Sequence, residues 1–284
     1  MPCMDILFGT AGVPRNAPDR STLAGLDALS LLDLDCMEIE FVQRVSMGAE
    51  MAAKVRQEAN ARGIALSVHA PYYINLNAHE ENIRLASRKR LKEAARVGAL
   101  CGATDIVFHP GFYLGDSAKV AFKTIQQELL SVTRELVEEQ VSAMLRAETT
   151  GKPSQFGSLE EILNLAQTVL GVGICIDFSH LHARSPYQMQ DEFVRDLERV
   201  RIALGHSALE QLHVHVSGMH YTKKGERNHL NLGDSDFPYL LLLQALKSEH
   251  AGGRLICESP NLEKDALLLK KRWKALAVAE SVPN

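Results

Sequence analysis

The chain of 284 residues contains no long run of uncharged apolar residues, so no segment is predicted to be a membrane-spanning helix. Its first residues lack the basic start and the apolar core of a secretory signal. Its five cysteines are scattered without a CxxC pair, which argues against a disulfide framework and is typical of a reducing compartment. From these absences we expect a cytoplasmic protein that does not associate with a membrane.

The chain also lacks the glycine-rich phosphate loops of nucleotide-binding proteins, since neither GxGxxG nor GK[ST] occurs. No linker rich in Ser, Gly or Pro divides it, so residues 1–284 are predicted to form one domain. The formal net charge is −4, which excludes a uniformly basic surface. Binding of nucleic acid would therefore need a local basic patch or metal ions near the phosphates.

Short apolar runs alternate with stretches of helical periodicity along the whole chain. The eight runs predicted to be strands cover residues 6–9, 37–42, 64–69, 105–109, 142–148, 173–177, 212–216 and 254–258. Eight strand–helix alternations in this length favour a single (β/α)8 TIM barrel, in the α/β class. An open doubly wound sheet is the alternative, and it ordinarily uses fewer strands.

Six successive predicted strands, the third to the eighth, end in His, Asp or Glu. The carboxyl ends of barrel strands meet at one mouth, where barrel enzymes place their chemistry. One such residue alone could be structural, but so many buried acids and imidazoles are rare without cations between them. The set is His69, His109, Glu148, Asp177, His215 and Glu258, with His180 in the loop after the sixth strand and His229 in a polar loop predicted over residues 219–236.

The chemistry of this set indicates the type of ion. Imidazole combined with carboxylate suits zinc, and also manganese or iron, whereas magnesium or calcium sites are built almost entirely from oxygen. Carboxylates gathered in one mouth would repel each other without cations. Eight ligands exceed what one ion takes, so the sequence predicts two or three metal ions per chain.

Five segments, in their order along the chain, resemble the endonuclease IV family of apurinic/apyrimidinic endonucleases. They are VHAPYYINL at 68–76, FHPG at 108–111, ETTG at 148–151 with FG at 156–157, CID at 175–177 with His180, and HLNLG at 229–233. The resemblance spans about residues 7–273. It implies a (β/α)8 barrel with a trinuclear zinc site that cleaves DNA 5′ to an abasic site in base excision repair.

The resemblance also implies how the ligands are shared among the ions. His69, His109 and Glu148 would hold the first zinc; Glu148 would bridge to a second zinc held also by Asp177, His215 and Glu258; His180 and His229 would hold the third. The expected mechanism is in-line attack on phosphorus by a hydroxide that bridges two metal ions. Glu148, which holds the metal spacing, and Glu258, which orients or deprotonates the water, are the predicted catalytic residues.

Two positions depart from the family pattern. The family has Asp two residues before the histidine matched by His229, and this chain has Arg227 there. Either Glu226 reaches the metal instead, or Arg227 contacts phosphate. After His215, where the family usually shows Asn-Asp, this chain continues with the segment 216–218, Val-Ser-Gly.

Four residues are the predicted contacts to damaged duplex DNA. Tyr72 matches a family position that enters the DNA at the lesion, and an exposed aromatic ring there could stack on bases or fill a gap. The alternative for Tyr72 is packing on the rim of the barrel. Lys223, Lys224 and Arg227 form a small basic cluster suited to backbone phosphates, although such clusters can also be simply solvated.

Two other functions fit the same residues. One is a sugar isomerase or epimerase, which also uses histidines and carboxylates around one or two divalent ions. The other is a metal-containing protein that binds DNA without catalysis. The protein is expected to be a monomer. Arg146, two residues before Glu148, should share its inward face, and the sequence offers no partner for it.

Overall fold

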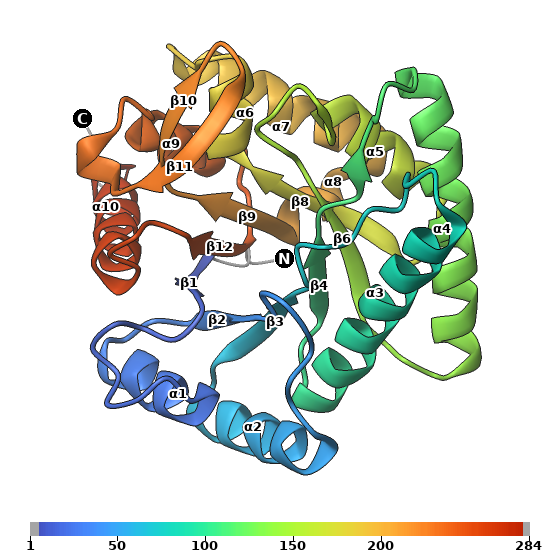
Figure 1. Ribbon diagram of the computed structural model, residues 1–284. Coiled ribbons are helices and arrows are strands. Elements are labelled where there is room, and N and C mark those ends of the chain that lie inside the picture. Colours follow the sequence, from blue (N-terminus) through green and yellow to red (C-terminus); the bar gives the residue numbers. More distant parts are fainter. Residues whose placement is uncertain (1–5, 281–284) are drawn as a thin grey trace.

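The computed structural model describes residues 6–280. Its centre is a closed barrel of eight parallel strands in the order β1-β12-β9-β8-β6-β4-β3-β2 (Figure 1). These strands are β1 (Ile6–Ala11), β2 (Cys36–Glu40), β3 (Ala65–His69), β4 (Asp105–Phe108), β6 (Met144–Glu148), β8 (Val172–Asp177), β9 (Leu212–Val216) and β12 (Gly253–Cys257). The closed parallel sheet confirms the predicted (β/α)8 barrel and excludes the open sheet.

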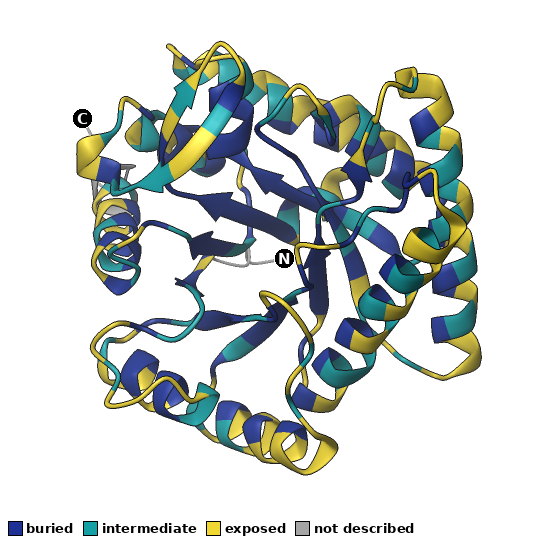
Figure 2. Cartoon of the chain, in the orientation of Figure 1, coloured by how far each residue is buried: buried dark blue, intermediate teal, exposed yellow. Residues whose placement is uncertain are grey.

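Helices surround the barrel, and Figure 2 shows them buried on the inner side and exposed on the outer side. The longer ones are α1 (Thr22–Leu31), α2 (Ala49–Arg62), α3 (Glu81–Cys101), α4 (Ala118–Glu138), α5 (Leu159–Thr168), α7 (Gln190–Leu204), α9 (Tyr239–Ser248) and α10 (Glu263–Glu280). Two short helices, α6 (Phe178–Arg184) and α8 (His206–Glu210), complete the set. Within residues 6–280, none of the helices combines the length and apolarity needed to cross a membrane.

Local sequence signals place several helix ends. Ser158 caps α5 and forms a reciprocal capping box with Glu161, as the spacing of the two residues predicts. Helix α2 ends at Gly63, whose φ of 67° lies in the left-handed region that glycine adopts at little cost. These signals fix where each helix returns the chain to the barrel.

The barrel strands are buried on both faces, because one face meets the helices and the other fills the barrel interior. On β2, Met37 lies against α1 beside Gly25. Side chains alternate along a strand, so its neighbour Glu38 points into the barrel interior, where it is fully buried. A strand of this kind can therefore carry acidic residues without presenting them to solvent.

Two small antiparallel pairs of strands lie at the carboxyl end of the barrel. One joins β5 (Gly111–Phe112) to β7 (Gln155–Phe156), and the other joins β10 (Gly218–Thr222) to β11 (Gly225–Leu230). A short 3-10 helix, η1 (Leu232–Asp234), follows β11. The predicted polar loop over residues 219–236 is therefore wrong, since most of it is a β-hairpin.

The four cysteines in the described range, Cys36, Cys101, Cys175 and Cys257, are buried and form no disulfide with one another. Cys3 lies outside the described residues. These cysteines pack as small apolar residues within the barrel and its helices.

Candidate metal centre

Five of the predicted ligands lie where barrel strands end. Strands β3, β6 and β8 end at His69, Glu148 and Asp177, while His109 and Glu258 directly follow β4 and β12. Parallel strands in a closed barrel end at one rim, so residues far apart in sequence are brought together there. We call this rim the mouth.

One group at the mouth surrounds a single oxygen of Glu148. The Nε2 atoms of His69 and His109 lie 3.1 and 3.4 Å from Glu148 Oε2. One ligand atom from each of the three residues lies within 4.8 Å of the others. The Nδ1 atom of His109 is buried and has no hydrogen-bond partner among the described residues. Two imidazoles and a carboxylate oxygen at this spacing form a donor set that suits a zinc ion.

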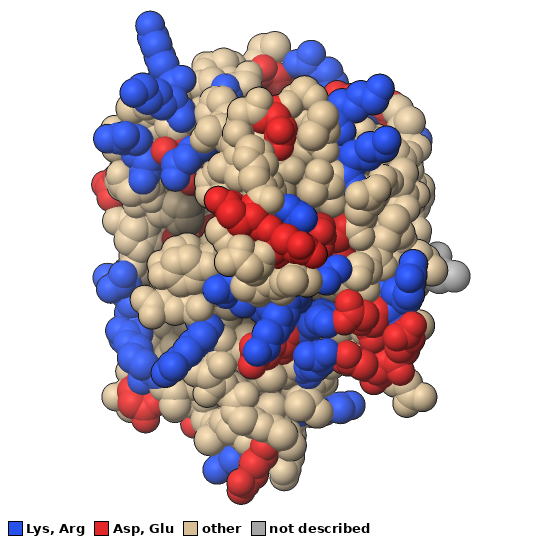
Figure 3. All heavy atoms as spheres, turned by 45° about the vertical axis from the view of Figure 1, so that its right-hand side comes forward, with Lys and Arg blue, Asp and Glu red and all other residues tan. Residues whose placement is uncertain are grey.

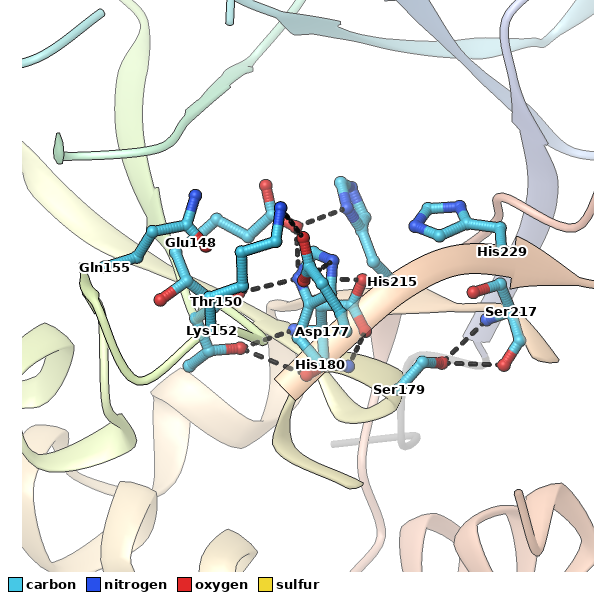
Figure 4. Close-up of polar contacts among 12 residues, drawn as sticks. Glu148, Thr150, Lys152, Gln155, Asp177, Ser179, His180, His215, Ser217 and His229 are labelled. Atoms are coloured by element: carbon cyan, nitrogen blue, oxygen red, sulfur yellow. Dashed lines mark hydrogen bonds and ion pairs between the residues drawn. The ribbon is translucent and has the colours of Figure 1, made fainter. Parts of the chain in front are cut away.

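A second group surrounds the other oxygen of Glu148. His215 Nδ1 lies 3.3 Å from Glu148 Oε1 and 3.3 Å from Glu258 Oε1. Asp177 completes the group, and the four ligand atoms lie within 4.8 Å of one another. Glu148 therefore offers one oxygen to each group. Figure 4 shows Glu148, Asp177, His180 and His215 pointing toward one another.

His180 lies in helix α6, so its prediction as a loop residue is wrong. The helix begins directly after β8 because the Asp177 side chain caps it, accepting a hydrogen bond of 2.8 Å from the His180 backbone N–H. This geometry brings His180 Nδ1 to 3.2 Å from Asp177 Oδ2 and 3.4 Å from Glu148 Oε1.

The β10–β11 hairpin contributes to a third group of possible metal ligands. Glu226 Oε2 lies 3.1 Å from His180 Nε2, yet both this oxygen and Asp177 Oδ2 are buried without a hydrogen bond among the described residues. The rings of His180 and His229 have centroids 5.9 Å apart. Approach without hydrogen-bonding geometry is the arrangement expected of ligands around a common cation.

An irregularity in β11 decides which residue reaches His180. Tyr221 pairs with Glu226 and His220 pairs with Asn228, so Arg227 has no partner across the hairpin. This extra residue is a β-bulge, which allows residues three apart, Glu226 and His229, to face the same side. Arg227 is left exposed. Of the two alternatives for this segment, the structure therefore brings Glu226 to the site.

Gly151, from the ETTG segment, makes room for this arrangement. A Cβ atom at position 151 would lie 2.2 Å from Glu226 Oε2. The backbone N–H of Glu226 also donates to the carbonyl of Gly151 over 3.2 Å. Any larger residue at 151 would displace Glu226 from His180.

Backbone carbonyls orient three of the histidines. The Nδ1 atoms of His69, His180 and His229 lie 2.9, 2.9 and 3.2 Å from carbonyl oxygens. A carbonyl only accepts hydrogen bonds, so each Nδ1 must carry a proton, and Nε2 is the nitrogen that can bind a cation once it has lost its own proton.

The electrostatics of the mouth favour positive charge. Burial alone lowers the pKa of an imidazole, but the hydrogen bond to Glu148 and the charges of Glu40 and Glu148 raise the pKa of His69 to about 10. Burial raises the pKa of Asp177 to about 6, with Glu258 and Glu148 adding to the rise and His180 opposing it. The pKa values of the His180 and His215 imidazoles are also raised well above the usual value, whereas burial lowers that of His109. Without metal ions, protons on His69, His180 and His215 therefore balance the carboxylates.

Two acidic residues of β2 belong to the same interior and were missed as candidates. Glu38 contacts His215 and His213, and Glu40 pairs in register with His69. Burial raises the pKa of the Glu40 carboxyl to about 8, partly offset by His69. The sequence signal that could have identified them is the alternation of apolar and acidic residues in the segment 37–40, Met-Glu-Ile-Glu. A barrel strand buried on both faces places every second residue in the barrel interior.

A deeper group of Cys175, His213 and His215 also brings its ligand atoms within 4.8 Å of one another. Burial raises the pKa of the Cys175 thiol well above its usual value, with His215 opposing the rise. A metal ligand must be a thiolate, so this environment disfavours the group as a site.

Arg146, for which the sequence offered no partner, lies at the opposite end of the barrel. Its Nε lies 2.6 Å from Asp105 Oδ1, and the guanidinium of Arg254 lies 3.0 Å from Asp105 Oδ2. The prediction that it shares the inward face of Glu148 is consistent with this position. Arg146 is therefore part of an ion cluster away from the mouth.

The predicted DNA contacts are all at the surface. Tyr72 is 51% exposed, and its ring lies 3.9 Å from that of Tyr73, centroid to centroid. Lys223, Lys224 and Arg227 are exposed on the β10–β11 hairpin. On the face in Figure 3, basic side chains are interspersed with acidic ones. A ring that is half exposed and in contact with Tyr73 is compatible both with a DNA contact and with packing on the rim.

Comparison with known sequences finds relatives of two kinds. An uncharacterised protein of Methanocaldococcus jannaschii is 43% identical over 273 residues, covering 95% of this chain and 98% of that protein. A probable endonuclease 4 of Mycobacterium tuberculosis is 27% identical over 213 residues, covering 73% of this chain and 79% of that protein.

Solved structures share the fold at low identity. Endonuclease IV from Thermus thermophilus has a TM-score of 0.74 at 18% identity, covering 95% of this chain and 99% of its own. A D-tagatose 3-epimerase-like protein has a TM-score of 0.71 at 19% identity, covering 96% and 100%. A family model described as the xylose isomerase-like TIM barrel matches residues 26–276. The chain therefore belongs to the xylose isomerase-like TIM barrel family.

Proposed function

We propose that this protein is a metal-dependent phosphodiesterase of the endonuclease IV type, which cleaves damaged duplex DNA 5′ to abasic sites. The observation that carries the proposal is the position of Glu148, whose two oxygens face two separate groups of ligands. Adjacent cation sites bridged by one carboxylate suit phosphodiester hydrolysis, in which attacking and leaving oxygens both need stabilisation. The relatives named probable endonuclease 4 support the same activity.

Divalent ions, two or three per chain, would be held by the residues at the mouth. Zn2+ fits the mixture of imidazole and carboxylate best, and Mn2+ or iron is the alternative. The first ion would take His69, His109 and Glu148, and the second Glu148, Asp177, His215 and Glu258. Once bound, the ions would supply an activated water and neutralise charge on the phosphate oxygens.

A third ion would take His180, His229 and Glu226. Glu226 occupies the place that the family pattern gives to an aspartate two residues before the histidine. Glu226 lies one residue further from His229 than that aspartate would. Its longer side chain and the bulge at Arg227 together compensate for the difference and bring its carboxylate to His180. The third ion would thus be held by the Glu226 carboxylate, which would face away from His229 if β11 alternated regularly.

The protein side chains have separate tasks in this proposal. Glu148 holds the spacing of the sites, and Glu258, 3.3 Å from His215 Nδ1, orients the attacking water. Tyr72 would enter the duplex at the lesion, where a missing base leaves room for a ring. Lys223, Lys224 and Arg227 would contact backbone phosphates and set the register of the duplex.

The test is strand cleavage of a duplex oligonucleotide carrying one abasic analogue, with metal content measured on the same sample. We expect a single cut 5′ to the analogue, loss of cutting after chelation, and recovery with Zn2+ or Mn2+. Binding without cutting by the metal-loaded protein would support the non-catalytic DNA-binding alternative and contradict the proposal.

A sugar isomerase or epimerase is the second candidate. The observation that favours it is that Glu148, Asp177, His215 and Glu258 form a complete set for one ion by themselves. Interconversion of ketoses at one carbon, measured on the same metal-loaded sample with abasic DNA as the parallel substrate, separates the two candidates.

A further inference from the structure

A continuous line of polar side chains runs through the barrel interior from the mouth toward the opposite end. It begins with Glu148 and His215 and continues through Glu38 on β2 to His213 on β9. Glu38 Oε1 lies 3.0 Å from His215 Nε2, and Glu38 Oε2 lies 2.9 Å from His213 Nε2. The three residues of this central part, Glu38, His213 and His215, have no exposed surface.

The line ends in the ion cluster at the amino end of the strands. His213 Nδ1 lies 3.7 Å from Asp105 Oδ2, and Asp105 is held by Arg146 and Arg254. Ser67 donates a further hydrogen bond of 2.7 Å to Glu38 Oε2. The Glu38 carboxylate is therefore fixed by partners on three other strands, β3 and β9 directly and β4 through His213.

His215 differs from the other mouth histidines in how its ring is held. His69, His180 and His229 present Nε2 to the mouth and place Nδ1 against a backbone carbonyl. His215 presents Nδ1, 3.3 Å from Glu148 Oε1, and its Nε2 lies 3.0 Å from Glu38 Oε1. This second contact is an ion pair rather than a hydrogen bond among the described residues. A side-chain carboxylate thus occupies the place that a carbonyl has at the other three rings.

We infer that Glu38 is a positioning residue that holds the ring of His215 with its Nε2–H toward the interior and its Nδ1 lone pair toward the mouth. A carboxylate behind a ligating histidine fixes the ring, selects the tautomer and increases the basicity of the ligating nitrogen. The inference deepens the proposed function and rests on it, because it concerns the ligand His215 of the second proposed ion.

The experiment measures the affinity of the metal-free protein for Zn2+ by competition with a chromophoric chelator. Glu38→Gln keeps the size of the side chain but removes the negative charge that faces His215 Nε2, so affinity for the ion held by His215 should fall about 10–100-fold. Ser67→Ala is the matched control, since it removes one bond to Glu38 without touching His215. Its affinity should stay within about threefold of the wild type.

A purely structural role for Glu38 would lower the thermal midpoint of Glu38→Gln and leave its zinc affinity equal to that of the wild type, and this outcome overturns the inference. Nitrogen-15 NMR of the zinc-loaded wild-type protein gives a second reading that needs no variant. The Nε2–H tautomer of His215 is expected, and the Nδ1–H tautomer would contradict it. A wild-type protein that binds no zinc would instead remove the proposed function itself.

Discussion

The two ends of the barrel differ in how the negative charge of a buried aspartate is balanced. At the amino end, burial raises the pKa of the Asp105 carboxyl, but His213 and the paired guanidinium groups of Arg146 and Arg254 hold it well below the usual range. At the mouth, burial raises the pKa of Asp177 to about 6. Asp105 thus has two permanent cations beside it in addition to His213, whereas the charged neighbours of Asp177 among the described residues are imidazoles and further acids.

The difference shows where exchangeable cations are needed. Among the described residues, the only lysine or arginine in ion-pair contact with a mouth ligand is Lys152, 3.4 Å from Glu226 Oε1. The remaining carboxylates at the mouth rely on protons or metal ions for balance. The charge balance of such a site depends on cations that exchange with solvent, which is the property expected of a metal centre.

The largest expected effect comes from removing one negative charge at the mouth. Glu258→Gln keeps the shape of the side chain but loses the charge that we propose orients the water. We expect cleavage of abasic DNA to fall at least about 10³-fold, the scale of losing a group that acts on the transition state, while binding of that DNA survives. The surface variant Glu160→Gln on α5 should cleave normally. Retained turnover by Glu258→Gln would exclude the role.

At the amino end, the same kind of change should affect stability rather than activity. Asp105→Ala leaves two largely buried guanidinium groups without their carboxylate, so we expect the free energy of unfolding in urea to fall by about 3–5 kcal/mol. The control Asp27→Ala breaks an exposed pair with Arg62, and it should cost less than about 1 kcal/mol. Equal losses for the two variants would contradict the comparison between buried and exposed pairs.

The protons that balance the mouth predict a pH dependence of metal binding. The pKa of His69 is about 10 in the metal-free protein, so at pH 6–9 a cation must displace its proton. Affinity for Zn2+ should therefore rise with pH, about tenfold per unit for each proton displaced, and level off above pH 10. Calorimetry in two buffers of different ionisation enthalpy measures the protons released. An affinity independent of pH would show that the histidines are neutral in the empty site.

The smallest effect is expected outside the mouth, on the hairpin. Replacing Lys223, Lys224 and Arg227 together by Ala should weaken binding of intact and abasic duplexes alike and lower the salt dependence of binding by about three counterions. Turnover at saturating DNA should not change, because these residues do not reach the ligand groups. Arg201→Ala, near the carboxyl end of α7, is the matched control. A loss confined to abasic DNA would point to lesion recognition instead.

Much of the fold and part of the site follow from the sequence because the signals are local. Apolar runs of strand length separated by helical periodicity predicted the eight strands and the closed barrel. Since the carboxyl ends of barrel strands must share one rim, residues such as His69, Glu148 and Asp177 could be grouped without knowing any distance. Helix α6 was missed because the segment after Asp177 was interpreted as a loop, although Asp177 caps a helix there.

The remaining features depend on contacts between segments. Glu226 reaches His180 only because a bulge at Arg227 shifts the alternation of β11, and no local signal in the sequence marks that bulge. The partner of Arg146 is Asp105 on the neighbouring strand β4, so strand order and register had to be known.

The sequence by itself thus determined the barrel and the polar residues that end its strands, because periodicity and strand direction are properties of a single chain segment. Only the tertiary structure decided that Glu148 divides its oxygens between two groups and that Glu38 lies behind His215. Those relations join side chains from different strands across the barrel interior, and their distances are set by closure of the sheet rather than by any one segment.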